Sequence, residues 1–431
     1  MPVASSGAID LDEFHVEAGG STGSSCSIND ADIRALIDKS DGATMAFNEW
    51  YGATASLDQD SGTATAFGAN SSNLKNLAVT FDSNSNKVVV VYRLSDKAYA
   101  VVGTPADDLS ITFGSVVQID STSLQYGGKM DVTFDSNSNK VVVVYGLGNT
   151  SSYAGRAIVG TVSGTGISFG SPTNFTSSGA DNQINCEFDS NSNKVVVCWT
   201  QNDSNQSMGT AIVGTVSGTG ISFGSAATFF RCNAMNITFD SNSNKVVVFA
   251  QDTNAGVNYA KALVGTVSGT DISFGTAAQV GSATESLDSN DGTGAVFDSN
   301  SNKCVFFFID SSDSDKGKAI VGTVSGTDIS FGNLATFFND RTERLPRKGA
   351  FDTNVNKVVI TYQNYNHNNR RTEVVVGTVS GTGISFNTPA VLHATGPDYA
   401  NSTFDSNLNK VVAVFRDNGN EGRAVVFQNA T

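Results

Sequence analysis

Short apolar runs alternate with clusters of Asp, Ser, Asn and Gly along most of the chain, and the pattern repeats about every fifty residues. The phrase FDSNSNK, in places slightly changed, marks each copy and begins at Phe81, Phe134, Phe188, Phe239, Phe297, Phe351 and Phe404. Most copies contain four apolar runs of strand length separated by short turns. This pattern predicts a four-stranded antiparallel meander in each copy.

The second run of each copy is apolar at successive positions, as in VVVVY at residues 141–145. A strand with one solvent-exposed face alternates apolar and polar residues, whereas a continuous apolar run indicates a strand covered on both faces. Sheets stacked radially around an axis provide that cover in a β-propeller, whose closure leaves only short edges. A solenoid of stacked sheets would need polar capping repeats, and the final copy does not have the character of a cap.

The two ends of the repeat region complement each other. The seventh copy stops after its third run, at residues 423–428, and SGTATAFG at residues 61–68 resembles the fourth-run phrase SGTGISFG at residues 163–170. We therefore predict an all-β fold over residues 61–431. It is a seven-bladed β-propeller of four-stranded antiparallel blades, and its last blade is completed by an N-terminal strand that closes the ring.

Residues 1–60 differ from the repeats and predict a short N-terminal extension. SINDADIRALIDK at residues 27–39 has apolar side chains at helical spacing and begins like a capping box, which predicts one short helix. Large apolar side chains then gather in residues 42–53. They either pack on the rim of the ring or dock to another protein. The predicted docking residues are Ile33, Leu36, Ile37, Met45, Phe47, Trp50 and Tyr51.

The charge balance excludes one class of partner. The chain has 26 basic and 41 acidic side chains, a net charge of −15. Nucleic-acid binding needs a positive footprint, so no nucleic-acid partner is expected. Five cysteines at irregular spacing indicate neither a disulfide framework nor a metal site. Cys198 and Cys304 lie inside apolar runs, where buried side chains are expected.

The recurring turn resembles the opening of a calcium loop, because Asp82, Asn84 and Asn86 give D-x-N-x-N. The sixth position is Lys87 where a calcium loop has Gly, and the later ligand positions carry no carboxylate. Asp and Asn also stabilise such turns by bonding nearby backbone N–H groups. We therefore expect turn chemistry, with no metal and no cofactor.

Catalytic chemistry has little support in the sequence. The three histidines, His15, His367 and His393, are far apart and have no nucleophile signature beside them. We therefore expect no catalytic residue and no enzyme activity.

The loops on the two faces of the predicted ring differ. The turns after the first and third strands are nearly constant, while the loops after the second and fourth strands vary in length and content. Varied loops on a rigid scaffold usually carry binding function, and aromatic, amide and guanidinium groups suit sugars. Ordinary solvated loops look similar. The candidate receptor-face residues are Tyr126, Lys129, Phe230, Arg231, Arg341, Arg344, Arg347, His393 and Tyr399.

The blade phrase FDSNSNKVVVVY…GTAIVGTVSGTGISFGS resembles repeats of tail and fibre proteins of marine bacteriophages. The N-terminal SSGAIDLDEF and INDADIRALIDK…NEWYGA are similar to the leader of structural proteins of the same phages. The resemblance implies a virion component, a tail fibre or tail-associated appendage. It would dock to other virion proteins through its N-terminal extension, in multiple copies, and expose its propeller. The resemblance carries over no catalytic or binding residue.

A virion protein of this kind would recognise a host-surface glycan. Two other functions share the fold: a depolymerase that degrades polysaccharide, and an architectural subunit that forms a ring, tube or decoration. The chain begins without a basic and apolar signal segment and has no run of eighteen apolar residues. We expect synthesis in the host cytoplasm without a signal peptide, and no membrane insertion.

Overall fold

The computed structural model describes residues 60–124, 129–148, 153–203, 206–254, 259–281, 287, 292–342, 345–365, 370–394 and 398–429. Ser61–Gln428 forms one compact unit. In this described part, the regular elements are β-strands apart from one 3₁₀ turn at Ser311–Asp313, so the all-β prediction is confirmed. No helix there is long and apolar enough to cross a membrane. The helix predicted at residues 27–39 and all the predicted docking residues lie outside the described residues: Ile33, Leu36, Ile37, Met45, Phe47, Trp50 and Tyr51.

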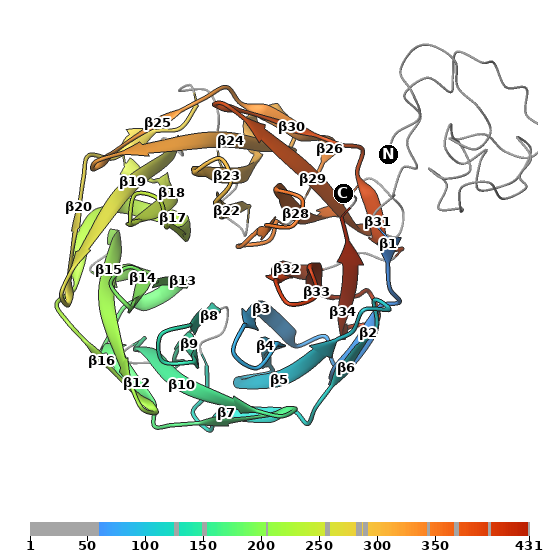
Figure 1. Cartoon of the computed structure of the whole chain (residues 1–431). Coiled ribbons are helices and arrows are strands. Elements are labelled where there is room, and N and C mark those ends of the chain that lie inside the picture. The colour runs from blue at the N-terminus through green and yellow to red at the C-terminus, as the bar shows by residue number, and fades with distance from the viewer. Residues whose placement is uncertain are drawn as a thin grey trace, which may run out of the picture. The chain divides into compact units, whose positions relative to one another are not determined.

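The described strands form six antiparallel sheets that stand around a common axis, as in a propeller (Figure 1). The first strands of the copies lie nearest the axis and are β3 (Leu74–Asp82), β8 (Met130–Asp135), β13 (Ala180–Asp189), β17 (Ala227–Asp240), β22 (Thr293–Asp298), β27 (Ala350–Asp352) and β32 (Asp398–Asp405). The second strands are β4 (Lys87–Leu94), β9 (Lys140–Gly146), β14 (Lys194–Asp203), β18 (Lys245–Asp252), β23 (Lys303–Asp310), β28 (Lys357–Asn364) and β33 (Lys410–Arg416).

The third strands are β5 (Lys97–Pro105), β10 (Gly155–Ser163), β15 (Gln206–Ser217), β19 (Tyr259–Ser268), β24 (Lys316–Ser325), β29 (Arg371–Ser380) and β34 (Glu421–Gln428). The outer strands are β6 (Ile111–Phe113), β11 (Gly166–Phe169), β16 (Gly220–Phe223), β20 (Asp271–Phe274), β25 (Asp328–Phe331), β30 (Gly383–Phe386) and β1 (Asp60–Ser61). Short fifth segments follow them: β2 (Thr65–Asn70), β7 (Val117–Asp120), β12 (Thr173–Thr176), β21 (Ala278–Gln279), β26 (Ala335–Arg341) and β31 (Ala390–His393).

The outer edge of each sheet is a strand broken in two. In the second copy, β11 pairs with β10 at residues 160–163, and β12 pairs with the same edge of β10 at residues 155–157. The sequence pattern predicts four strands and misses this short fifth segment. In one place the segment is continuous with the next first strand: β17 pairs with β15 at its start and with β18 over its remainder. Two meanders therefore merge into one nine-stranded sheet.

The N-terminal strands pair with the C-terminal strand, in a register that differs from the prediction. Both β1 and β2 pair with β34. The Gly62 N–H donates to the Val426 carbonyl at 2.9 Å, as the Gly170 N–H donates to the Val159 carbonyl. Gly62 therefore corresponds to Gly170, whereas the match of phrases aligns Gly68 with it. The prediction that residues 61–68 form the fourth strand is wrong: β1 takes that place, and β2 corresponds to β12.

The continuous apolar runs are covered on both faces, as predicted. Residues 141–145 of β9 are all 0 % exposed. Val143 and Tyr145 pack into the cluster shared with the first copy, and Val142 and Val144 pack into the cluster shared with the third. Burial of one such side chain contributes about 1.5–3 kcal/mol. Cys198 and Cys304 are also fully buried within such runs, which confirms the expectation for them.

Glycines on the third strands accommodate phenylalanines of the fifth segments. A Cβ built on Gly155 would lie 2.2 Å from the Phe175 ring, and one built on Gly422 would lie 2.3 Å from the Phe67 ring. Glycine is needed because any larger side chain would meet the ring. In the first copy the larger Ala98 replaces the glycine, and the smaller Ile119 replaces the phenylalanine. The two sites therefore vary together within one chain.

A second set of glycines touches the next copy. A Cβ built on Gly170 would lie 2.0 Å from the carbonyl oxygen of Thr219 in the following turn. The same fit recurs at Gly114, Gly224, Gly275 and Gly332. The sixth copy instead ends its outer strand with Asn387, whose Oδ1 accepts the Val376 N–H at 2.9 Å. The next copy takes its outer strand from β1, so no turn after β34 crowds that position.

The constant turn after each first strand is held by its aspartate. Asp135 Oδ1 accepts the N–H groups of Asn137 at 2.9 Å and Ser138 at 3.0 Å, and Asn139 adopts a left-handed φ of 53°. The same pair of bonds recurs at Asp82, Asp189, Asp240, Asp298, Asp352 and Asp405. The predicted turn hydrogen bonds are therefore confirmed.

Removing divalent metal is expected to leave the melting temperature unchanged. Asp135 already bonds two backbone groups, and no cluster of three potential ligands from His, Cys, Asp and Glu occurs among the described residues. An ion bound at a hundred times its dissociation constant would contribute about 2.7 kcal/mol. The check is thermal unfolding with and without EDTA. A fall of several degrees would contradict a turn held by hydrogen bonds alone.

Candidate functional site

The predicted receptor-face residues lie at several separate places. Tyr126 and Arg344 fall outside the described residues. The carbonyl of Lys129 accepts the Gly146 N–H at 3.4 Å beside the start of β8. Arg231 lies on β17 and pairs with Met208 of β15.

Three of these residues take part in aromatic contacts. The Phe230 ring lies 5.6 Å from Nζ of Lys261, and the Tyr399 ring lies 5.6 Å from the guanidinium of Arg416. The His393 ring is 5.3 Å from a buried phenylalanine ring. Phe230 lies on β17, Tyr399 on β32 and His393 on β31, and an exposed cation–π pair contributes about 0.5–1 kcal/mol. They stabilise the strand ends that carry them.

Arg341 belongs to a compact basic cluster. It ends β26, while Tyr365 directly follows β28 and Arg370 directly precedes β29. The guanidinium carbons of Arg341 and Arg370 lie 4.0 Å and 4.6 Å from the centre of the Tyr365 ring. The Tyr365 N–H also donates to the Arg341 carbonyl at 3.1 Å, which ties the two loops together. One ring thus brings two cations together.

Arg341 of this cluster is partly open to solvent. The side chain of Arg341 is 45 % exposed, and its Nε lies 3.3 Å from Asp315 Oδ2. Two guanidinium groups therefore meet at one ring on a chain whose net charge is −15. Guanidinium groups match carboxylate, sulfate and phosphate through paired N–H donors. The geometry therefore suits an anionic group. We name Arg341, Tyr365 and Arg370 the arginine–tyrosine cluster.

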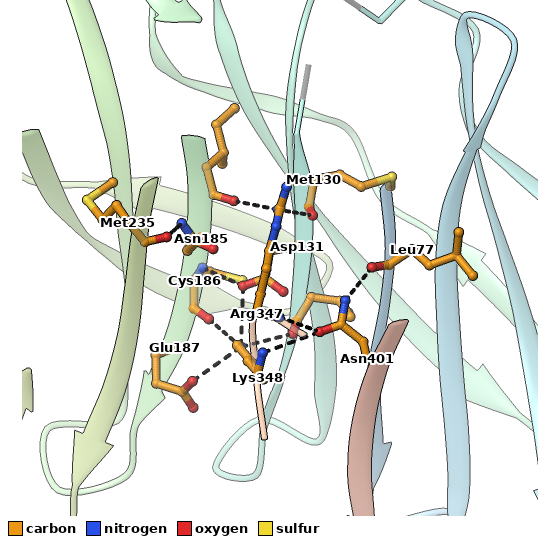
Figure 2. Close-up of polar contacts among 12 residues, drawn as sticks. Leu77, Met130, Asp131, Asn185, Cys186, Glu187, Met235, Arg347, Lys348 and Asn401 are labelled. Carbon is orange, nitrogen blue, oxygen red and sulfur yellow. Dashed lines mark hydrogen bonds and ion pairs between the residues drawn. The ribbon is translucent and has the colours of Figure 1, made fainter. Parts of the chain in front are cut away.

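Arg347 lies elsewhere, in the axial region, with Lys348 beside it. Arg347 donates to the carbonyls of Met130 at 3.1 Å and Ile184 at 3.5 Å. Figure 2 shows both cations extending from the segment before β27 towards β8 and β13. They therefore reach past the neighbours of β27 to strands of the second and third copies. The prediction groups Arg347 with Arg341, but their surroundings are different.

The Lys348 ammonium is held by two carbonyls and two carboxylates. Its Nζ donates to the Cys186 carbonyl at 2.7 Å and to the Val132 carbonyl at 3.4 Å. It lies 3.3 Å from Asp131 Oδ2 and 3.2 Å from Glu187 Oε2. The Lys348, Asp131 and Glu187 side chains are 18 %, 3 % and 24 % exposed. This arrangement supplies the partners that a largely buried charge requires.

The charges within this network set the pKa values of its members. Burial lowers the pKa of Lys348, but Asp131 and Glu187 outweigh burial and raise the pKa well above its ordinary value. Lys348 is therefore a cation at neutral pH. Burial raises the pKa of Glu187, and Lys348 opposes part of that rise.

Asparagines link neighbouring first strands around the same axis. The side-chain amide of Asn185 donates to the Met235 carbonyl at 2.8 Å, and that of Asn401 donates to the Leu77 carbonyl at 2.6 Å (Figure 2). Asn236 makes the equivalent bond at 2.6 Å to the next strand. Each bond satisfies a backbone carbonyl of the adjacent strand, so the inner strands are joined by polar contacts.

The fifth copy makes room for the cations. It has Gly294 where four other copies have Asp or Asn, three residues before the recurring phenylalanine. A Cβ on Gly294 would lie 2.4 Å from the Pro346 carbonyl oxygen. Glycine is therefore required where the segment leading to Lys348 passes.

An axial cavity of about 420 Å³ opens on the side of the constant turns. It extends from the turn residue Ser83 inward to Lys348 and Glu187. The recurring phenylalanines line it: Phe81, Phe134, Phe188, Phe239, Phe297, Phe351 and Phe404. Hydroxyl-bearing residues of the first strands also line it: Thr80, Thr133, Thr238, Ser402 and Thr403.

Sequence analysis misses this axial network. The available signal is the residue three places before each recurring phenylalanine, which is Asp131, Asn185, Asn236, Lys348 or Asn401 in five copies. A polar residue that recurs inside an otherwise apolar strand indicates a buried polar partner. Aligning the copies would therefore have found these positions, although not their partners.

Comparisons with known proteins show the fold and nothing more. No protein-family model matches the chain, and no curated protein matches it. Among solved structures, the chain is similar to a protein from Lactobacillus plantarum determined by structural genomics. The TM-score is 0.51 at 13 % identity, over 74 % of this chain and 85 % of that one. This likeness supports a propeller-like fold.

Proposed function

We propose that this protein is a non-enzymatic recognition subunit of a bacteriophage virion that binds an acidic glycan of the host surface. The observation that carries the binding proposal is the arginine–tyrosine cluster, in which Arg341 and Arg370 lie within 4.6 Å of one tyrosine ring. It lies on loops that vary between copies, where binding function usually resides. Carboxylated or sulfated sugars provide the anionic group that two guanidinium groups recognise.

The scaffold we propose is a seven-bladed propeller closed by the N-terminal strand. The nine-stranded sheet contains two meanders, so the six sheets together hold seven copies. Pairing of β2 with β34 supports closure, as do the contacts of β3 with both β8 and β32. A closed ring fixes the loops relative to one another, which suits a recognition surface.

The virion assignment is supported by the resemblance of the blade phrase and the leader to phage tail and fibre proteins. In this proposal residues 1–60 dock to other virion proteins, and several copies of the chain are displayed on one particle. Display in several copies would raise the avidity of a weak sugar contact, because later contacts become intramolecular.

Binding to alginate, a polyuronate, is expected to exceed binding to neutral dextran and to weaken when the cluster is removed. We expect Arg341→Ala and Arg370→Ala each to lower alginate affinity about tenfold or more, because a hydrogen bond to a charged group contributes about 1.5–3 kcal/mol. Lys87→Ala in a constant turn removes the same charge and serves as the matched control. The measurement is a binding titration of each variant at fixed salt.

Three outcomes would contradict the proposal. Equal affinity for alginate and dextran, or unchanged alginate affinity in both arginine variants, would exclude recognition by the cluster. Release of new reducing ends from the polysaccharide would show a depolymerase instead.

A further inference from the structure

One pair of positions beside the loop between the second and third strands changes its chemistry in the sixth copy. In the fourth and seventh copies the pair is an aspartate and a cation, joined at 2.5 Å: Asp252 with Lys261, and Asp417 with Arg423. In the sixth copy the same two places hold Asn364 and Glu373. The carboxylate thus lies on the third strand, and an amide takes the place of the acid.

Glu373 is 6 % exposed, and two neutral donors hold its carboxylate. Its Oε2 accepts the Tyr362 hydroxyl at 2.9 Å, and its Oε1 accepts the side-chain amide of Asn364 at 2.8 Å. Lysine and arginine side chains have no acceptor, so the cation of the other copies could not make the bond to Asn364. The change to glutamate therefore fixes the Asn364 side chain.

Asn364 lies where the two loops of the arginine–tyrosine cluster meet. It directly precedes Tyr365, and its backbone forms a bridge with Thr342, the residue after Arg341. The Thr342 hydroxyl donates to the Gln363 carbonyl at 2.8 Å, and the Tyr365 N–H donates to the Arg341 carbonyl at 3.1 Å. A fixed Asn364 therefore fixes the strand ends that carry Arg341 and Tyr365.

We infer that Glu373 is a positioning residue of the arginine–tyrosine cluster, and that it acts through Asn364 to hold Arg341 against the Tyr365 ring. The inference rests on the proposed function, because the cluster is the proposed anion site. A guanidinium group binds carboxylate or sulfate through paired donors in a fixed geometry. Such a site loses affinity when the residues that support it leave it loose.

The test compares Glu373→Ala with Glu373→Gln in the full chain, with alginate as the probe. We expect Glu373→Ala to weaken alginate binding about three- to tenfold, the effect of one lost hydrogen bond. Glu373→Gln should keep the affinity, because its amide oxygen accepts the Asn364 bond and its NH₂ group donates to the Tyr362 hydroxyl. Asn364→Ala leaves the Tyr362–Glu373 bond in place and should weaken binding as Glu373→Ala does.

A second readout reports the geometry of the cluster without any ligand. Selective ¹⁵N labelling of arginine gives the Nε–H signal of Arg341, identified by its loss in Arg341→Ala. The Tyr365 ring lies 4.0 Å from the guanidinium carbon and should shift this signal by its ring current. We expect Glu373→Ala to remove that shift and Glu373→Gln to retain it.

Arg156→Ala is the matched control, because Arg156 occupies the place of Glu373 in the second copy and pairs with a tyrosine in the same register. It should change neither the alginate affinity nor the Arg341 signal. A lower melting temperature of Glu373→Ala with both readouts unchanged would overturn the inference and leave Glu373 a support of the fold alone. An equal rise in affinity in the alanine and glutamine variants would also overturn it, since the charge alone would then matter.

Failure of the inference differs from failure of the proposed function. If Arg341→Ala weakened alginate binding while Glu373→Ala and Asn364→Ala did not, the anion site would stand and the positioning role would be overturned. If alginate bound no better than dextran while Glu373→Ala still removed the ring-current shift of Arg341, the positioning role would be supported and the proposed ligand would be wrong.

Discussion

Replacing Lys348 with Met is expected to lower the free energy of unfolding by about 3–5 kcal/mol at neutral pH. Methionine has a similar volume to lysine, so the loss of stability arises from removal of the charge. Without the ammonium, Asp131 and Glu187 remain in the axial region with no cation at 3.2–3.3 Å. The carbonyl of Cys186 also loses its 2.7 Å donor. Denaturant unfolding gives the measurement.

This loss should depend on pH, with a defined sign. Burial already raises the pKa of Glu187, and loss of the neighbouring cation would raise it further. The folded variant would then hold a proton that the unfolded chain releases, so its stability rises as pH falls. The deficit should therefore shrink as the pH falls from neutral towards the ordinary pKa of a glutamate, about 4.3.

Lys97→Met is the control, because Lys97 pairs with an aspartate whose side chain is 54 % exposed. An exposed pair of that kind contributes about 0–1 kcal/mol. If Lys348→Met behaved like this control, with the same pH dependence as the unsubstituted chain, the axial ion network would have no structural role.

Phe67→Ala is expected to destabilise the protein by about 3–5 kcal/mol, as other buried phenylalanine truncations do. Phe67 is 2 % exposed and packs against Tyr92, with ring centres 5.4 Å apart, and against Phe113 at 5.7 Å. It lies on β2, so this prediction tests whether the N-terminal strand belongs to the folded ring. Equal stability of the variant and the unsubstituted chain would exclude that packing.

A pair of substitutions makes the test specific for Gly422. Gly422→Ala alone should destabilise by about 1–3 kcal/mol through overpacking, since its Cβ would lie 2.3 Å from the Phe67 ring. Adding Phe67→Ile should recover part of the loss, because the chain itself pairs Ala98 with Ile119 at the equivalent places.

The same exchange at Gly317 and Phe337 is the control within one continuous copy, where a Cβ would lie 2.4 Å from the ring. Both pairs should respond alike. A different result is that the stability losses of Gly422→Ala and Phe67→Ile simply add, while the control pair recovers stability. That result would contradict packing of Phe67 against Gly422.

Much of the fold can be predicted because the repeat carries it. Runs such as residues 141–145 indicate doubly covered strands, and Asp135 indicates its own turn. The register of the N-terminal strand cannot be obtained from matching phrases, since SGTATAFG resembles a fourth strand while its hydrogen bonds place Gly62, not Gly68, beside Val426. Packing of Phe67 against Gly422 decides the register, and that contact joins opposite ends of the sequence.

The candidate site is predictable only in part. Variation between copies identifies the loop of Arg341, but Tyr365 becomes its partner through a contact between two loops. Arg347 stands in a polar stretch, NDRTERLPRK, that has the composition of a solvated loop. The path of the segment that carries it depends on space left by Gly294 in another copy, where a Cβ would meet the Pro346 carbonyl oxygen. Such long-range complementarity is absent from any local pattern.

The junction at Asn387 affects which repeat units of the gene can be duplicated or exchanged by recombination. Each glycine at the equivalent place fits the turn of the following copy, as Gly170 fits Thr219, so interior units share one junction and could be duplicated or exchanged in frame. The unit ending at Asn387 has a different junction, because its side chain bonds Val376 where no turn intrudes. Recombination among interior units would preserve their junctions, whereas an exchange across this one would place an asparagine against a carbonyl. Asn387 therefore marks the boundary in the gene across which an exchange of repeat units would disturb the packing.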